Sequence, residues 1–261
     1  MPDSAHITGI VFYVIRIFMT LLYSKLATVY HEMYQHIFDY DHEFHFYDQI
    51  LSENNCHKIL EIGCGTGLLA RQFLNNGYDY LGLDLYQEML DIAREEVLNG
   101  KFIQGDMRAL TFHQQFDSVL ITGRSMAYII ENKDIIATLT GVYNALKEDG
   151  LFIAGFFEAN GIFDNFDDFE QTIIHQHKKI VRTSHLNKNL KTGWTYDWNA
   201  TYSIEEGNET TVFEDFSTLR AFTKDEISLF LKMTGFKMKE MIEEKKAFTV
   251  IAEKKTGELY P

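Results

Sequence analysis

Short apolar runs alternate with amphipathic stretches over much of this chain. The runs are rich in β-favouring side chains, as buried parallel strands require. They predict strands over residues 59–62, 80–85, 101–104, 116–122 and 151–157. Between them, apolar residues recur at three- and four-residue steps, as in Leu85, Met89, Ala93 and Val97, which predicts helices. This alternation predicts a mostly parallel sheet with helices on both faces.

The pattern changes after the fifth predicted strand. Residues 172–222 show period-two stretches without glycine loops, which predicts three antiparallel strands forming a cap at one edge. Thr223 and Glu226 have the spacing of a capping box, so a helix should begin there and end at Gly235. Residues 236–241 and 247–253 then predict a closing antiparallel pair of strands.

The chain begins with an apolar stretch over residues 7–23 that Arg16 interrupts. The stretch is shorter than the roughly 20 residues needed to span a bilayer. Three interpretations compete: a membrane anchor, a packed helix or strand, and an extension upstream of a true start at Met19. We favour the last, with residues 1–18 as the extension and 19–261 as one domain containing the 172–222 cap. An amphipathic helix is predicted over residues 23–34.

Composition narrows the class of protein. The 261 residues are 46% hydrophobic and carry a formal net charge of −14. A nucleic-acid partner normally needs a basic footprint, so we expect none. Two cysteines are too few for a disulfide framework, and the histidines near residues 31–45 lack a supporting carboxylate pattern, so no metal site is expected. We expect a cytoplasmic protein without a membrane partner; the oligomeric state stays open, a homodimer included.

The first predicted strand runs into a glycine loop, E-I-G-C-G-T-G over residues 61–67, followed by a helical pattern. Glycines let the backbone turn sharply and let a ligand approach it closely. Gly65, Gly67 and Ala70 formally satisfy a dinucleotide-binding pattern, although a lone match is a weak signal. Glu61 favours another ligand, because an acid would repel a pyrophosphate but suits the cationic end of S-adenosylmethionine.

Two aspartates follow later strands. Asp84 ends the second predicted strand about 20 residues beyond the loop, where doubly wound sheets place an acid for ribose hydroxyls. Asp106 follows the third strand in the sequence Gly105-Asp106-Met107. A carboxylate there can accept from an adenine amino group, while the next backbone N–H donates to the ring.

The loop, Asp84, the Gly105-Asp106-Met107 turn and the sequence L-K-E-D-G at residues 146–150 resemble, in this order, the class I S-adenosylmethionine-dependent methyltransferases. The closest resemblance is to small-molecule members, N,N-dimethyltransferases of nucleotide-linked amino sugars. Those enzymes carry Tyr-Asp where this chain has Tyr30-His31, so a role for that acid does not transfer.

The resemblance implies a Rossmann-like doubly wound α/β fold with a mostly parallel seven-stranded sheet, its last strand antiparallel, and a small antiparallel β cap after strand five. It implies S-adenosyl-L-methionine as cofactor, S-adenosyl-L-homocysteine as product and a small-molecule methyl acceptor. The expected cofactor residues are Tyr23, Tyr34, Glu61, Gly63, Cys64, Gly65, Gly67, Leu68, Asp84, Leu85, Met89, Gly105, Asp106, Met107 and Thr122.

Methyl transfer from a sulfonium to nitrogen or oxygen is an in-line displacement, so the protein mainly aligns the reactants and excludes water. Tyr128 and Glu158 follow strands four and five at the ligand-binding rim and are the catalytic candidates. Each also has a structural explanation: packing for the tyrosine and solvent exposure for the glutamate. An NAD-type oxidoreductase and a catalytically silent binding protein are the alternative functions.

Overall fold

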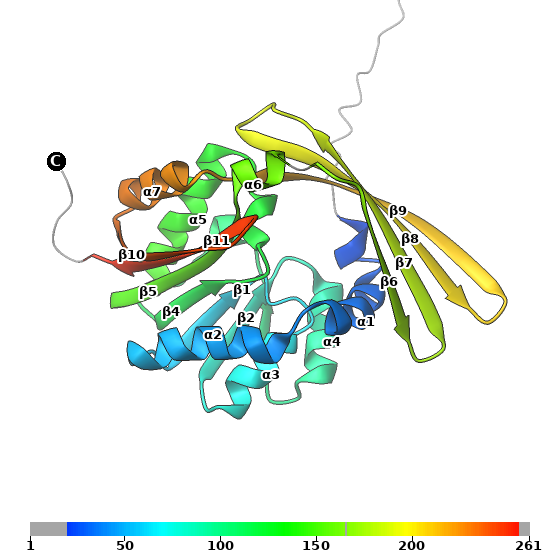
Figure 1. Ribbon diagram of the computed structural model, residues 1–261. Coiled ribbons are helices and arrows are strands. Elements are labelled where there is room, and N and C mark those ends of the chain that lie inside the picture. The colour runs from blue at the N-terminus through cyan, green and yellow to red at the C-terminus, as the bar shows by residue number, and fades with distance from the viewer. Residues whose placement is uncertain (1–19, 165, 256–261) are drawn as a thin grey trace, which may run out of the picture.

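The fold is described from a computed structural model, which covers residues 20–164 and 166–255. Its centre is a seven-stranded sheet in the order β10-β11-β5-β4-β1-β2-β3 (Figure 1). Strands β1 (Lys58–Ile62), β2 (Asp79–Asp84), β3 (Lys101–Gln104), β4 (Phe116–Ile121) and β5 (Leu146–Phe157) are parallel. β11 (Ala247–Lys254) is antiparallel to β5 and to β10 (Phe236–Glu243), which confirms the predicted closing pair.

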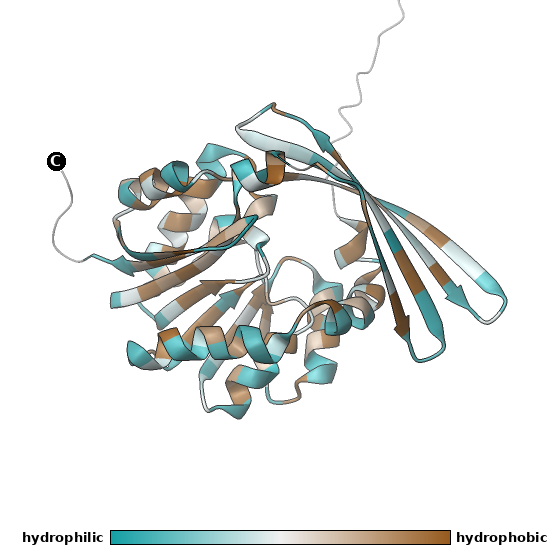
Figure 2. Ribbon diagram, viewed as in Figure 1, coloured by the Kyte–Doolittle hydropathy of each residue, from teal (hydrophilic) through white to brown (hydrophobic). Residues whose placement is uncertain are grey.

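Helices cover both faces of this sheet, as predicted. One face packs against α2 (Tyr40–Glu53), α3 (Leu68–Asn75) and α4 (Gln87–Glu96), and the other against α5 (Asn132–Ala145) and α7 (Lys224–Met233). Figure 2 shows apolar residues concentrated in the strands and polar ones along the outer sides of α2, α3 and α4.

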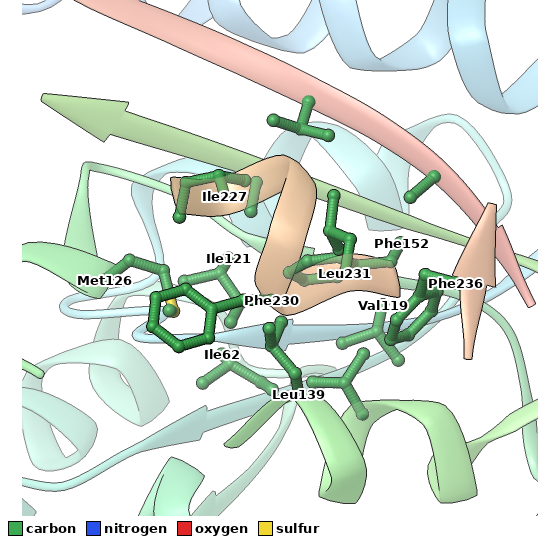
Figure 3. Packing of buried hydrophobic residues seen from close by; sticks show 14 of the residues in the cluster. Ile62, Val119, Ile121, Met126, Leu139, Phe152, Ile227, Phe230, Leu231 and Phe236 are labelled. Atoms are coloured by element: carbon green, nitrogen blue, oxygen red, sulfur yellow. The ribbon is translucent and has the colours of Figure 1, made fainter. Parts of the chain in front are cut away.

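The apolar face of α7 shows how the second layer is held. Ile227, Phe230 and Leu231 lie in one buried cluster with Val119 and Phe152 of the sheet (Figure 3). The helix begins with the predicted capping box: the Glu226 backbone N–H donates to the Thr223 hydroxyl, and the Glu226 carboxylate accepts from the Thr223 N–H. Local capping and apolar spacing therefore agree on where this helix starts and faces.

The insert after β5 is a separate antiparallel sheet in the order β6-β7-β8-β9. Its strands are β6 (Phe169–His175), β7 (Lys178–Lys188), β8 (Trp194–Glu206) and β9 (Glu209–Ala221), so it has four strands rather than the three expected. The expectation missed β6 as a separate strand because its residues are all exposed or half-buried, which leaves a weak apolar alternation.

The N-terminal segment lies between the two sheets (Figure 1). A short turn η1 (Leu21–Tyr23) leads into α1 (Ala27–Ile37), which starts later than the predicted helix. Leu22, Leu26 and Met33 share a buried cluster with Ile180 and Tyr202 of the insert. This packing sets η1 and α1 beside the carboxyl ends of the main strands. The expected extension, residues 1–18, lies outside the described residues.

None of the helices within residues 20–164 and 166–255 is both long and apolar enough to cross a membrane.

Candidate active site

The glycine loop after β1 takes a backbone path that ordinary side chains resist. Gly63, Gly65 and Gly67 have φ angles of +75°, +55° and +75°. A Cβ atom on Gly63 would lie 2.4 Å from the Ser125 hydroxyl oxygen, and one on Gly67 would lie 3.2 Å from the Ala93 methyl. The loop therefore needs glycine for both its torsions and its close contacts.

Asp84 ties this loop to the end of β2. Its carboxylate accepts a hydrogen bond from the Gly65 N–H at 2.9 Å and another from the Tyr86 N–H at 3.0 Å. The side chain is buried, and burial raises its pKa even though these N–H groups oppose the shift. Each carboxylate oxygen can accept more than one hydrogen bond, so Asp84 keeps capacity for a ligand.

Asp106 follows β3 and caps the short turn η2 (Met107–Ala109). Its carboxylate accepts from the Arg108 backbone N–H at 2.9 Å and from the Arg108 guanidinium. Hydrogen bonding to Arg108 holds the pKa of Asp106 below its ordinary value. Asp106 is therefore an ionised acceptor at the same end of the sheet as Asp84.

One cavity of about 400 Å³ opens at the carboxyl ends of β1 to β4. Its floor is the glycine loop with the two aspartates; η1, α1 and strand β9 of the insert close over it. Its lining includes Tyr23, Tyr30, Gly63, Gly65, Asp84, Tyr86, Asp106, Ser125, Tyr128 and Ser217.

Tyrosines from four segments crowd the part of the cavity beneath the insert. The hydroxyls of Tyr23 and Tyr128 are 2.7 Å apart, and the Tyr23 ring lies 5.5 Å from those of Tyr30 and Tyr86, centroid to centroid. Tyr86 also accepts a hydrogen bond from the Thr20 N–H at 3.1 Å. Burial raises the pKa values of Tyr23, Tyr30 and Tyr128 well above the ordinary range, so these hydroxyls stay protonated.

Many of the predicted site residues meet at this cavity. Those that line it are Tyr23, Gly63, Gly65, Asp84, Leu85, Met89, Gly105, Asp106, Met107 and Tyr128. Those that do not are Tyr34, Glu61, Cys64, Gly67, Leu68, Thr122 and Glu158.

Glu61 lies beneath the cavity floor. It belongs to β1, and strand alternation turns its side chain into the layer between the sheet and α3, where it is only 2% exposed. Its carboxylate accepts from the Thr122 hydroxyl at 2.6 Å and from the Tyr80 hydroxyl, which links β1 to β2 and to the end of β4. Burial raises the pKa of Glu61 to about 7.

Three further predicted site residues, Glu158, Tyr34 and Cys64, also lie outside the cavity lining and make other contacts. Glu158 caps α6 (Ala159–Phe163) by accepting from the Gly161 N–H at 2.6 Å, beside a different hollow of the surface. Tyr34 stacks on Tyr30, with ring centroids 3.9 Å apart, and so stands behind the cavity wall. The Cys64 thiol is buried against the backbone, and burial raises its pKa.

The structure also brings in residues that the sequence analysis did not select. Tyr86 and Ser125 follow strands β2 and β4, so their position after a strand is the signal that would have found them. Phe216, Ser217 and Thr218 come from the middle of β9, where no local motif marks them. Their place in the wall depends on how the insert docks.

No group of three or more His, Cys, Asp or Glu side chains that could hold a metal ion occurs in the part of the chain that the structure describes.

Comparisons with known proteins agree with this geometry. Residues 59–150 match a family of methyltransferase domains. YqeM of Bacillus subtilis (strain 168), whose name classes it with the methyltransferases, is 28% identical over 227 residues, covering 84% of this chain and 87% of YqeM. A glycine/sarcosine N-methyltransferase of Aphanothece halophytica is 29% identical over 117 residues, 42% of this chain and 44% of that enzyme.

A solved structure with a similar fold is also a methyltransferase. The sugar N-methyltransferase KedS8 of Streptoalloteichus superposes with a TM-score of 0.75 at 17% identity, covering 96% of this chain and 98% of KedS8. The matching domain and the likeness to YqeM over most of both chains identify this chain as a class I S-adenosylmethionine-dependent methyltransferase, and it shares its fold with KedS8.

Proposed function

We propose that this methyltransferase transfers the methyl group to a nitrogen atom of a small-molecule amine. The observation that carries the proposal is that one cavity holds both the loop with its aspartates and the tyrosine cluster. Its volume, about 400 Å³, falls within the range of roughly 300–1,000 Å³ typical of small-molecule sites.

The residues of the floor fit S-adenosylmethionine. Gly63 and Gly65 present bare backbone to the cavity, as a closely approached ligand requires. In our proposal, Asp84 accepts from the ribose hydroxyls, while Asp106 and the Met107 N–H hold the adenine. When bound, the cofactor supplies a methyl group already activated on a sulfonium, so the protein's task is alignment and exclusion of water.

The chemistry of the tyrosines favours nitrogen over oxygen. A neutral amine has a free lone pair, whereas an alcohol must lose a proton as it attacks. Tyr23, Tyr30 and Tyr128 have raised pKa values, so their hydroxyls stay protonated and are not available as bases, and Asp106 is engaged by Arg108. The names of the glycine/sarcosine enzyme and of KedS8, both N-methyltransferases, support the same choice.

Tyr128 is the proposed orienting group for the acceptor. Its hydroxyl is fixed by the Tyr23 hydroxyl at 2.7 Å, and its ring lines the cavity. A phenol in this position can accept a hydrogen bond from an amine N–H while the nitrogen lone pair stays free. We assign no such role to Glu158, whose carboxylate is used in the cap of α6.

A panel of paired amines and alcohols with matched carbon skeletons tests the proposal. The protein, S-adenosylmethionine and each compound are incubated, and methylated products are identified by mass spectrometry. We expect N-methylated products and a large loss of turnover in Tyr128→Phe with cofactor affinity kept. Methylation of alcohols alone would contradict the choice of nitrogen, and cofactor binding without any product would favour a silent binding protein.

A further inference from the structure

Within residues 20–164 and 166–255, Arg182 is a buried cation without an acidic partner. It lies on β7 and faces α1, with only 4% of its surface exposed. In these residues, its hydrogen-bond partners are neutral: the Tyr34 hydroxyl at 3.2 Å, the Gln171 side-chain oxygen and the Tyr202 hydroxyl. Its Nε atom has no partner there. The guanidinium lies among three aromatic rings, and that of Trp198 is nearest, at 5.4 Å.

Two further buried donors on the same face of the insert have no hydrogen-bond partner in the part of the chain that the structure describes. The Ser184 hydroxyl is two residues from Arg182 on β7, and alternate residues of a strand share a face. The Trp198 indole N–H lies on the neighbouring strand β8, under the guanidinium. Buried polar groups are normally hydrogen-bonded. The Nε atom of Arg220 is also unpartnered among the described residues, so the donors beside Arg182 that need an explanation are the Ser184 hydroxyl and the Trp198 indole N–H.

Arg220 is a second buried arginine of this fold, and it has an acidic partner. It is also buried, with 1% exposed, but its guanidinium pairs with the Glu226 carboxylate at 2.8 Å and with the Ile130 carbonyl at 2.7 Å. A buried charge without such a partner carries a large desolvation cost. Arg182 is about as buried as Arg220 but has no carboxylate beside it among the residues that the structure describes.

The missing anion can be supplied from the acceptor side of the cavity. Tyr34, which bonds Arg182, stacks on the cavity residue Tyr30 with centroids 3.9 Å apart. Trp198 pairs across the sheet with the cavity residue Ser217. Arg182 itself does not line the cavity, and the half-buried side chains of Tyr34 and Trp198 are its links to the residues that do.

We propose that the acceptor amine carries an anionic group, a carboxylate or a phosphate, that binds Arg182. The inference rests on the proposed amine methylation, because it places the nitrogen at Tyr128 and the anion at the insert. The Arg182 guanidinium would form charge-assisted hydrogen bonds to the anion, with Ser184 and Trp198 as neighbouring donors. The insert would thus select acidic amines over neutral ones.

Trp198 offers a direct readout of anion binding. The chain has two tryptophans, so Trp194→Phe leaves Trp198 as the sole indole, beside Arg182. In that background, with S-adenosylhomocysteine bound, acetate and inorganic phosphate are titrated while fluorescence is followed, with chloride at matched ionic strength. We expect a saturable change with one of the two anions. Arg182→Met should weaken that binding on the order of tenfold or more, as when a hydrogen bond to a charged group is lost.

Two controls keep the test specific. Lys179 lies on β7, like Arg182, but is exposed and pairs with Glu205 of β8 at 3.1 Å. Lys179→Met removes this cation and should leave the anion titration unchanged. The melting temperature of Arg182→Met should equal or exceed that of the wild type, because methionine replaces a buried charge that has no carboxylate partner in the described residues. If neither anion changes the Trp198 fluorescence, or if folded Arg182→Met binds them equally well, the inference is overturned.

A kinetic arm separates this inference from the proposed function. Glycine, 2-aminoethyl phosphate and ethanolamine are compared as acceptors, the last as the neutral probe. Arg182→Met should raise KM for an anionic amine by about tenfold or more and leave ethanolamine unaffected. Equal KM values for neutral and anionic amines would overturn the anion site while amine methylation stands. Arg182-dependent anion binding without methylation of any amine would overturn the proposed function instead.

Discussion

Glu61 is the residue whose position differs most from its predicted role. An acid before a glycine loop suggested direct contact with a cationic ligand, yet its carboxylate is sealed between Thr122 and Tyr80. The sequence pattern predicted a cofactor contact, but strand alternation turns the Glu61 side chain away from the cavity. Its contribution is to join β1, β2 and β4 beneath the loop.

The raised pKa of Glu61 predicts a pH-dependent stability. Burial raises this pKa from its ordinary 4.5 to about 7, so the folded protein holds a proton that the unfolded chain has lost. The free energy of unfolding should therefore fall as the pH rises between these values, by on the order of 3 kcal/mol. Glu61→Gln should lack this fall when urea unfolding is measured across that range, whereas exposed Glu95→Gln should keep it. Parallel profiles for wild type and Glu61→Gln would contradict the assignment.

Asp84 should contribute to cofactor affinity. Asp84→Ala removes the acceptor that faces the cavity and should weaken binding of S-adenosylhomocysteine by about 1–3 kcal/mol, the range for a hydrogen bond to a charged group. It also leaves the Gly65 and Tyr86 N–H groups without their partner, so the melting temperature should fall. Asp84→Asn keeps one acceptor oxygen, so it should lose less cofactor affinity and less thermal stability than Asp84→Ala. Calorimetry showing unchanged affinity in the alanine variant would remove Asp84 from the site.

Gly63 should be intolerant of a side chain for two separable reasons. Gly63→Ala imposes a left-handed backbone on alanine, at about 1–2 kcal/mol, and adds a clash with the Ser125 hydroxyl. Combining it with Ser125→Gly removes the clash but not the strain, so the double variant should recover part of the lost stability. Denaturant unfolding of the single and double variants measures the two parts. No recovery at all would show that backbone strain alone limits this position.

The insert contributes to the cavity through a strand that the sequence does not mark. β8 carries the aromatics Trp194, Tyr196, Trp198 and Tyr202 at even spacing, a pattern that suits either a packed face or an acceptor pocket. Tyr196 and Tyr202 are buried in packing clusters, while β9 supplies the cavity wall at Phe216, Ser217 and Thr218. β8, whose alternating aromatics stand out in the sequence, is therefore not the strand that lines the cavity; β9 lines it.

Exchanging the insert should change the acceptor without changing cofactor binding. Replacing residues 169–221 with the matching segment of a relative of known acceptor exchanges β9 and Arg182 but leaves the glycine loop and Asp84. Specificity in open α/β folds resides in such loops and caps at the rim. The chimera should bind S-adenosylmethionine as before and methylate the relative's acceptor in a competition assay. A folded chimera that keeps its original preference would exclude the insert as the selector.

At the scale of the whole molecule, the N-terminal segment closes the cavity from outside the sheet. The Leu21 N–H donates to Asp215 of β9 at 2.7 Å, and Thr20 reaches Tyr86 after β2. Residues 20–23 therefore join the insert to the main domain above the glycine loop.

Two truncations should separate the extension from this closing segment. A chain starting at Met19 keeps Thr20, Leu21 and Tyr23 and should bind cofactor and methylate like the full chain. A chain starting at Lys25 loses the Leu21–Asp215 contact and the Tyr23 hydroxyl beside Tyr128, so acceptor KM should rise. Calorimetry and steady-state kinetics compare the two with the full chain. Loss of folding in the Met19 form would show that residues 1–18 belong to the fold.

Features that depend on local physics were determined by the sequence alone. The β–α alternation, the three glycines, the Thr223–Glu226 cap and Asp84 at the end of its strand were all predictable, because each depends on residues close together in the chain. The tertiary structure alone decided which residues from distant segments share the cavity. Tyr23, Tyr128 and Ser217 meet through the docking of η1 and the insert. The burial of Arg182 among neutral partners was decided in the same way, because contacts between residues far apart in the sequence leave no periodic signal.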